Sequence, residues 1–199
     1  MQATFTNITP LLTLSFLVAF VYSSVGHGGA SGYLAVLSFY SFPHEQMASS
    51  ALCLNILVSG MAFRAFAKAR HFSWKLTWPF IAISIPAAFI GGLIKVPKSF
   101  YSFLLAGVLL FVALRLIMDT YFERKETALS IAPFFPSLFI GAGIGLISGV
   151  VGIGGGIFLS PLLLFFHWAN PKQTAATSAF FIFLNSLAGL LGRTFRQNF

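Results

Sequence analysis

Charged residues and cysteine are both scarce in this sequence of 199 residues. Charged residues make up 8% of the chain and hydrophobic residues 57%, whereas charged residues are about a quarter of a typical soluble domain. Residues 1–44 and 129–171 contain no Lys, Arg, Asp or Glu at all. A water-exposed surface cannot be built from such stretches, so the composition excludes a soluble globular protein and indicates an integral membrane protein.

The single cysteine, Cys53, lies inside an apolar segment. One cysteine excludes a disulfide framework and a cysteine-based metal site. We expect its side chain to act as a small buried hydrophobic group.

Acidic residues are the scarcest charged class, with four Asp and Glu against 12 Lys and Arg. None of the four lies in a predicted membrane span, so the sequence offers no buried carboxylate for cation coupling. The spans also contain no nucleophile and base, no acid pair and no metal-ligand spacing. We therefore predict that the protein is not an enzyme, with no catalytic residue, no metal and no cofactor. The basic residues are scattered over short connections, which favours membrane topology over nucleic-acid binding.

Six apolar segments approach the length of roughly 20 residues that a membrane-spanning helix needs. They are Ile8–Val25, Gln46–Phe63, Leu76–Ile94, Phe100–Leu114, Ile131–Val151 and Gln173–Gly192. Two shorter apolar pieces, Tyr33–Phe42 and Ile157–Trp168, each follow a glycine cluster. The first long segment has no preceding positive residue and no cleavage site, so we interpret it as a retained helix rather than a signal peptide.

The second half of the sequence repeats the first. The stretch "VGHGGASGYLAVL" aligns with "VGIGGGIFLSPLL", and the stretch that begins "FPHEQMASSALCLNIL" aligns with "NPKQTAATSAFFIFLN". Asn55 and Asn185 correspond only approximately, two positions out of register. We predict a first membrane repeat in residues 1–120 and a second in residues 121–199, forming an all-α, inverted-repeat helical bundle with glycine-broken short helices.

The first repeat continues into two further spans that have no counterpart after the second copy. The second repeat is therefore expected to be incomplete at the carboxyl end. Either the sequence is truncated, or another subunit, such as a second copy in a homo-oligomer, covers the surface that those helices would cover.

Basic residues predict the orientation. Arg64, Lys68, Arg70 and Lys75 make the first large connection positive, and basic residues also flank the connection between the repeats. The positive-inside rule assigns both connections to the cytoplasm. Arg193 and Arg196 then lie outside, which the same rule disfavours.

The glycine clusters predict breaks in the helices. Backbone without regular hydrogen bonding is tolerated in a bilayer only where protein covers it or where it lines a polar cavity. We interpret "GAGIGLISG", residues 141–149, as a helix-packing face, and "GIGGG", residues 152–156, as a break. A short helix after such a break presents unpaired amides that attract anions. We expect the two clusters to lie within about 15 Å of each other near the membrane centre.

Inverted repeats with broken helices are typical of secondary transporters. The stretch "GIGGGIFLSPLLL", followed by "NPKQTAATSAFFIFLNSLAGLLG", resembles the second-half signature of the TauE/SafE sulfite exporter family, and residues 26–57 resemble its degenerate first copy. The resemblance covers nearly the whole chain. It implies export of small anions, such as sulfite or organosulfonates, across the bacterial cytoplasmic membrane through a midplane site between the repeats.

Glycines of the two clusters and polar residues of the nearby helices are the candidate substrate-binding residues. They are His27, Gly28, Gly29, Ser49, Ser50, Asn55, Gly154, Gly155, Gly156, Thr177, Ser178 and Asn185. Each polar side chain also has a purely structural interpretation. The histidine can be satisfied by a nearby carbonyl, the hydroxyls can cap helices, and the asparagines can hydrogen-bond between helices because an unpaired amide in hydrocarbon is costly.

The alternative function is a non-transporting membrane assembly subunit or a membrane-embedded enzyme that uses its glycines for helix packing. A polar cavity between the two clusters favours the transporter, whereas clusters on separate surfaces favour the subunit.

Overall fold

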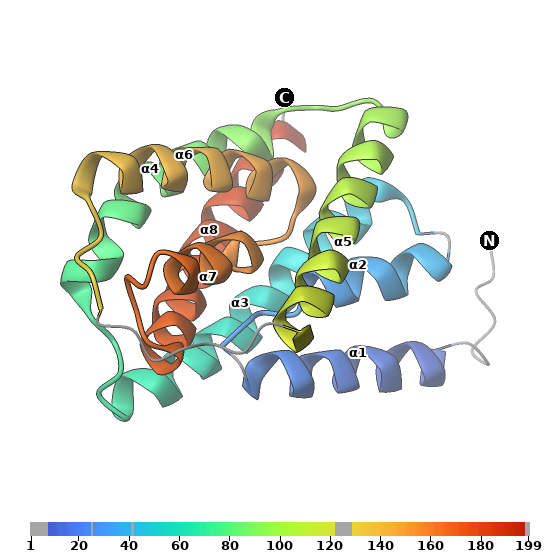
Figure 1. Cartoon of the computed structure of the whole chain (residues 1–199). Coiled ribbons are helices and arrows are strands. Elements are labelled where there is room, and N and C mark those ends of the chain that lie inside the picture. The colour runs from blue at the N-terminus through green and yellow to red at the C-terminus, as the bar shows by residue number, and fades with distance from the viewer. Residues whose placement is uncertain (1–7, 25, 41, 122–128, 198–199) are drawn as a thin grey trace.

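The computed structural model describes residues 8–24, 26–40, 42–121 and 129–197, and this part of the chain forms eight helices and no strand (Figure 1). The helices are α1 (Ile8–Ser24), α2 (Ala30–Phe39), α3 (His44–Lys68), α4 (Trp74–Leu93), α5 (Lys98–Tyr121), α6 (Phe134–Val151), α7 (Gly156–Phe165) and α8 (Pro171–Gln197). Each predicted apolar segment corresponds to one helix, so the all-α prediction is confirmed. Within the described ranges, α3, α4, α6 and α8 are long and apolar enough to cross a membrane.

The two breaks between helices have related backbone geometry, although Gly154 has a positive φ and its aligned residue Gly28 does not. Both contain glycines with positive φ, namely Gly26 and Gly29 in the first and Gly152, Gly154 and Gly155 in the second. The amide of His27 donates to the carbonyl of Tyr22, and the amide of Ile153 donates to that of Ser148 at the aligned position. We call residues 26–29 the first glycine turn and residues 152–155 the second. The repeated sequence therefore folds into a repeated turn.

Contacts between helices set their directions. Along α3 and α8, Leu52 lies near Gly189 and Gly60 lies near Phe183, so these two helices are antiparallel. The rings of Phe63 and Phe180, further along the same pair, are 4.5 Å apart between centroids. Because α3 and α8 align in the repeat, their opposite directions are what an inverted repeat requires.

Helix α4 packs closely against both α6 and α8. Three glycines of α6 spaced four residues apart face three carbonyls of α4 that are also spaced four residues apart, and in each case a Cβ atom would collide with the carbonyl oxygen. The pairs are Gly141 with Phe80, Gly145 with Ser84 and Gly149 with Ala88. These pairs run in register, so α4 and α6 are parallel. The packing role predicted for residues 141–149 is confirmed.

Helix α8 is also parallel to α4, since Thr77 contacts Thr177 near the starts of the two helices and Gly92 contacts Gly189 near their ends. Helices α4, α6 and α8 therefore begin at one end of the bundle, where α3 finishes. We call it the basic end, because Arg64, Lys68, Arg70 and Lys75 lie in or beside the α3–α4 connection there.

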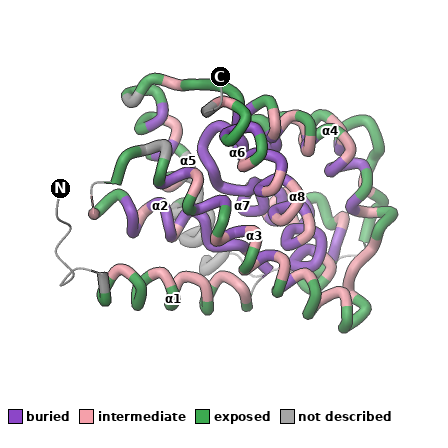
Figure 2. Tube along the Cα trace, turned by 180° about the vertical axis from the view of Figure 1, so that it is seen from behind, coloured by how far each residue is buried: buried purple, intermediate pink, exposed green. Residues whose placement is uncertain are grey.

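Burial is concentrated in the interior of this bundle. Figure 2 shows long buried stretches in α7, α8 and the second glycine turn, whereas the described side chains of α1 are exposed or half-buried. Cys53 is exposed, so the expectation that it is buried is wrong. It lies on the same face of α3 as Leu57 and Met61, which are also exposed, and that apolar face is turned outward.

The basic residues near the end of α8 stabilise the ends of other helices. The Nη2 atom of Arg193, which is 3% exposed, donates to the carbonyls of Gly149 and Val150 at the end of α6. The Nη1 atom of Arg196 donates to the carbonyl of Ile94 at the end of α4. Cations are favourable at the negative ends of helices. This role accounts for the two arginines at this end of the bundle without reference to the predicted orientation.

The α4–α6 interface yields a direct test. Gly145→Ala places a methyl group against the Ser84 carbonyl, and we expect overpacking to lower the free energy of unfolding by about 1–3 kcal/mol. Gly143→Ala is the matched control, because nothing lies within 4 Å of a Cβ atom at Gly143. Thermal unfolding in detergent measures both variants. Equal midpoints for the two variants would contradict close packing of α4 on α6.

Candidate functional site

The two glycine turns meet inside the bundle. A Cβ atom at Gly28 would lie 3.0 Å from Ile182 Cγ2, and one at Gly154 would lie 2.8 Å from the same methyl group. Both positions also abut the side chain of Asn55. The predicted proximity of the two clusters is therefore confirmed, and the contact joins residues of both repeats.

Each turn also packs against the third helix of the other repeat. Gly26 approaches the backbone of Ala175 on α8, and Gly152 approaches that of Ala48 on α3. In both cases a Cβ atom would come within 3.0 Å of the neighbouring backbone. The glycines are thus needed for close approach as well as for their positive φ values.

Asn55 connects the first repeat to the second turn. It is fully buried, and its Nδ2 atom donates to the carbonyl of Ile153 over 2.9 Å. That carbonyl lies in the break between α6 and α7. Asn55 supplies the partner that a buried peptide group requires.

Asn185 has a different environment. Its Nδ2 atom donates to Ser84 Oγ on α4 over 3.1 Å and to the carbonyl of Phe181 in its own helix. The structural interpretation, hydrogen bonding between helices, applies here. Asn55 and Asn185 therefore have different contacts, in agreement with their approximate alignment.

A polar cluster lies beside the turns and includes His27. The Nε2 atom of His27 is 3.0 Å from Ser160 Oγ, and Ser160 Oγ is 2.8 Å from Ser178 Oγ. These three side chains come from the first turn, α7 and α8, so the cluster joins the two repeats. Ser160 Oγ also donates to the carbonyl of Gly156 over 2.9 Å, so the hydroxyls and the imidazole can donate to an anion only in exchange for these internal hydrogen bonds.

The sequence analysis did not select Ser160. In the repeat it aligns with Leu34, so it is a polar residue at a position that is apolar in the other copy. That departure from the repeat is the signal that could have identified it.

The hydroxyl residues of α3 and α8 do not cap their helices. Helix α3 begins at His44 and α8 at Pro171, so Ser49, Thr177 and Ser178 lie more than one turn inside. The α8 start is capped by a reciprocal pair, in which Asn170 Oδ1 accepts from the Gln173 amide and Gln173 Oε1 accepts from the Asn170 amide. The capping interpretation is therefore wrong, since other residues occupy the helix starts.

The predicted residues divide into two groups. Thr177 is buried and its Oγ1 atom pairs with Thr77 on α4. Ser49 is half-buried and Ser50 is exposed, and neither takes part in the hydrogen bonds of the His27 cluster. The structure thus brings His27 and Ser178 together but leaves Ser49 and Ser50 outside that cluster.

The remaining glycines are closely packed. Gly29 and Gly155 are the residues that precede α2 and α7. A Cβ atom at Gly155 would lie 2.7 Å from Ile144 Cγ2 and 2.8 Å from Phe181 Cε1, and one at Gly156 would collide with Ile182. Bulky substitutions at these glycines would disturb packing as well as any bound anion.

Two further buried hydroxyls lie next to the second turn. Ser186 Oγ is 2.8 Å from the Cβ position of Gly154, and Ser148 Cβ is 3.5 Å from that of Gly155. Within the part of the chain that the structure describes, neither hydroxyl has a hydrogen-bond partner. Buried polar groups are normally paired, so these two hydroxyls are candidate donors for the proposal below.

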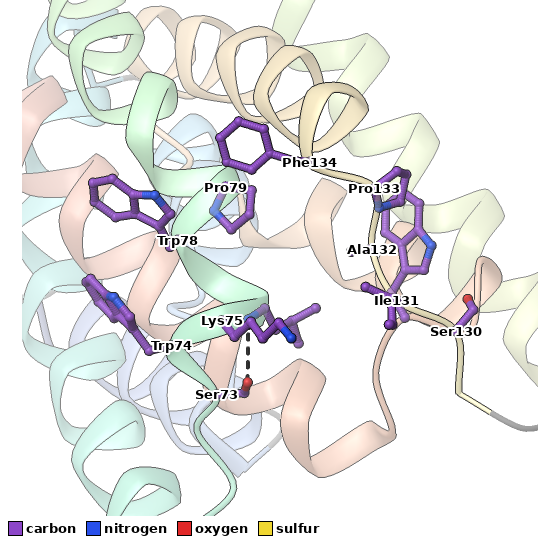
Figure 3. Close-up of a pocket in the computed structure, with 12 residues that line it drawn as sticks. Ser73, Trp74, Lys75, Trp78, Pro79, Ser130, Ile131, Ala132, Pro133 and Phe134 are labelled. Carbon is purple, nitrogen blue, oxygen red and sulfur yellow. Dashed lines mark hydrogen bonds between the residues drawn. The ribbon is translucent and has the colours of Figure 1, made fainter.

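The large cavity found in the described ranges does not lie between the two turns. It has a volume of about 1110 Å³ and opens at the basic end, where Lys75, Trp78 and Phe134 line it (Figure 3). This cavity is therefore not the polar cavity expected between the two glycine clusters. The turns themselves are buried and closely packed.

Comparison with known proteins identifies the family. The family model "Sulfite exporter TauE/SafE" matches residues 11–199. The chain belongs to the TauE/SafE family. A probable membrane transporter protein of Sinorhizobium fredii, y4hK, is 36% identical over 182 residues, which cover 89% of this chain and 72% of the relative. A probable membrane transporter protein of Methanocaldococcus jannaschii, MJ0441, is 26% identical over 202 residues, covering 94% and 73%. No solved structure gives a significant match.

The TauE/SafE assignment agrees with the fold, because the family is one of membrane exporters and the described part of the chain has four helices long and apolar enough to cross a membrane. In this TauE/SafE protein the parts repeated in the sequence, the glycine turns, are also the parts that meet. The candidate site therefore lies where the two repeated segments meet.

The hydrogen bond of Asn55 can be tested by mutation. Asn55→Ala leaves the Ile153 carbonyl without this donor, and we expect a loss of about 1–3 kcal/mol in the free energy of unfolding. Cys53→Ala, on the exposed face of the same helix, should change it by less than about 0.5 kcal/mol. Thermal unfolding in detergent compares the two. A loss as small for Asn55→Ala as for Cys53→Ala would show that the bond does not stabilise the turn.

Proposed function

We propose that this protein exports small oxyanions, such as sulfite or organosulfonates, across the bacterial cytoplasmic membrane, with the anion bound between the two glycine turns. The single observation that carries the proposal is that both turns and the cluster of His27, Ser160 and Ser178 come together from the two repeats. Midplane sites between repeats with broken helices are the general pattern in secondary transporters.

The chemistry of the site suits an anion. Ser148 and Ser186 contribute hydroxyls without partners among the described residues. The first amides of α7, at Gly156 and Ile157, precede the point where hydrogen bonding within the helix begins. Amides at a helix start, together with the positive end of its dipole, favour an oxyanion.

The energetics agree with export. An anion that leaves a cell with a negative interior gains about 2.3 kcal/mol per charge for each 100 mV. Export of this kind needs no coupled cation, in keeping with a sequence that places none of its four acidic residues in a predicted span. The protein would act as a transporter and not as an enzyme.

The two turns are packed so closely that little free space is left around their glycines. Gly28, Gly154 and Gly156 each lie too close to neighbouring side chains to accept even a methyl group. In the proposed cycle this packing represents a closed state, and movement of one repeat against the other would open the site to each side in turn.

Transport is best tested at Ser160. Ser160→Ala removes the hydroxyl that joins His27 to Ser178, and one hydrogen bond to a charged group contributes about 1.5–3 kcal/mol. We therefore expect sulfite efflux from loaded vesicles to fall by roughly tenfold or more, at matched protein level.

The matched control is Ser137→Ala. Ser137 is a buried serine of α6 whose Oγ atom bonds only the carbonyl of Pro133 in the same helix region, and efflux should be unchanged. A Ser160→Ala variant that exports sulfite at the parental rate would refute the site. A parent protein that moves no anion would instead favour the alternative of an assembly subunit.

A further inference from the structure

The cavity at the basic end is separate from the glycine turns. Its walls come from the start of α4 (Ser73 to Pro79), from residues 130–134 that lead into α6, and from Trp168 just before α8 (Figure 3). Its volume of about 1110 Å³ exceeds that of a typical small-molecule pocket, about 300–1,000 Å³. The candidate anion residues do not line it.

The chemistry of the lining is amphiphilic. The three tryptophans of the sequence, Trp74, Trp78 and Trp168, all line the cavity. Lys75 is the single charged residue among the lining residues, and no acidic residue is among them. The indoles of Trp74 and Trp78 are neighbours, with centroids 5.8 Å apart, and each is about half exposed. A ligand that fits such a lining has one anionic group and a large apolar part.

The wall opposite α4 is firmly held. Ser130 donates from its amide to the carbonyl of His167 and from its Oγ atom to that of Phe166. Trp168 stacks on Phe166 at 4.8 Å between centroids and lies 6.0 Å from Phe80. These contacts hold Ser130 against the loop before α8 and shape this wall of the cavity.

The position of the cavity indicates where its ligand comes from. It lies where α4, α6 and α8 all begin, at the end that carries Arg64, Lys68, Arg70 and Lys75. The positive-inside rule places this end at the cytoplasmic surface, and tryptophans concentrate at the level of lipid headgroups. The cytoplasmic leaflet carries anionic lipids that attract basic residues near the surface.

We propose that this cavity is a binding site for an anionic phospholipid of the cytoplasmic leaflet. The phosphate group of the lipid pairs with the ammonium group of Lys75, and the glycerol and upper acyl chains pack against Trp78 and Phe134. The positive ends of the α4 and α6 dipoles add to the attraction. The lipid would hold the starts of α4 and α6 together at the basic end, a role independent of the anion that the protein transports.

The tryptophans supply the test, because the intrinsic tryptophan fluorescence of the protein comes entirely from the walls of this cavity. The purified protein is reconstituted in vesicles in which either phosphatidylglycerol or phosphatidylcholine carries brominated acyl chains, and the quenching of fluorescence is measured. One basic residue near the surface contributes about fivefold in lipid binding. We therefore expect brominated phosphatidylglycerol to be preferred by about fivefold.

Lys75→Gln should abolish this preference, whereas Lys68→Gln, an equal change of charge at an exposed residue outside the cavity, should retain it. Equal quenching by the two lipids in the parent, or an unchanged preference in Lys75→Gln, would overturn the proposal. Relief of quenching by inorganic phosphate or sulfite would also overturn it, because the cavity would then bind a free anion. Sulfite efflux measured on the same vesicles reports separately on the transport site.

Discussion

Peptide groups inside a membrane must find hydrogen-bond partners, and the structure is organised around the two places where helices stop within the bundle. Where α6 ends, its last carbonyls are exposed to an apolar interior. The guanidinium group of Arg193 donates to the carbonyls of Gly149 and Val150, and the hydroxyl of Tyr101 donates to the carbonyl of Val151. Asn55 then satisfies Ile153 in the turn itself. These donors come from α3, α5 and α8, so the break is stable only because several helices surround it.

Small residues make that enclosure possible. In a bilayer, helices gain little from hydrophobic burial against each other and instead depend on close van der Waals packing. Helix α4 achieves this on two sides, against the glycines of α6 and against Gly189 and Gly192 of α8. Beside these three parallel helices, the side chains of Asn55 on α3 and Ile182 on α8 contact both turns. The close packing of the helices and the hydrogen bonds of the buried backbone carbonyls thus depend on the same interior helices.

The sequence predicts much of this arrangement because its signals are local. The absence of charge indicates the membrane, the apolar segments give the helices, and a glycine cluster repeated in both halves predicts both turns. What it could not predict depends on contacts between distant residues. Ser160 is a candidate only because it contacts His27, which is 133 residues away in the sequence. Cys53 is exposed because α8 packs against a different face of α3. The prediction that Ser49, Ser50, Thr177 and Ser178 cap their helices was wrong, because α3 and α8 begin several residues before them. The boundary between the repeats, the incomplete second repeat and the orientation stay predictions.

The central claim is that the first glycine turn and α7, which come from different halves of the sequence, meet inside the bundle at the candidate site. It is tested most directly by replacing both His27 and Ser160 with cysteine in a Cys53→Ala background and oxidising the protein in vesicles. Because the two native side chains are 3.0 Å apart, the account predicts rapid formation of a disulfide between the two cysteines, reversed on reduction. The pair Thr13→Cys and Ser160→Cys, with one position on the exposed face of α1, should not cross-link. Failure of the first pair to cross-link, or equally rapid cross-linking of the second pair, would contradict the account.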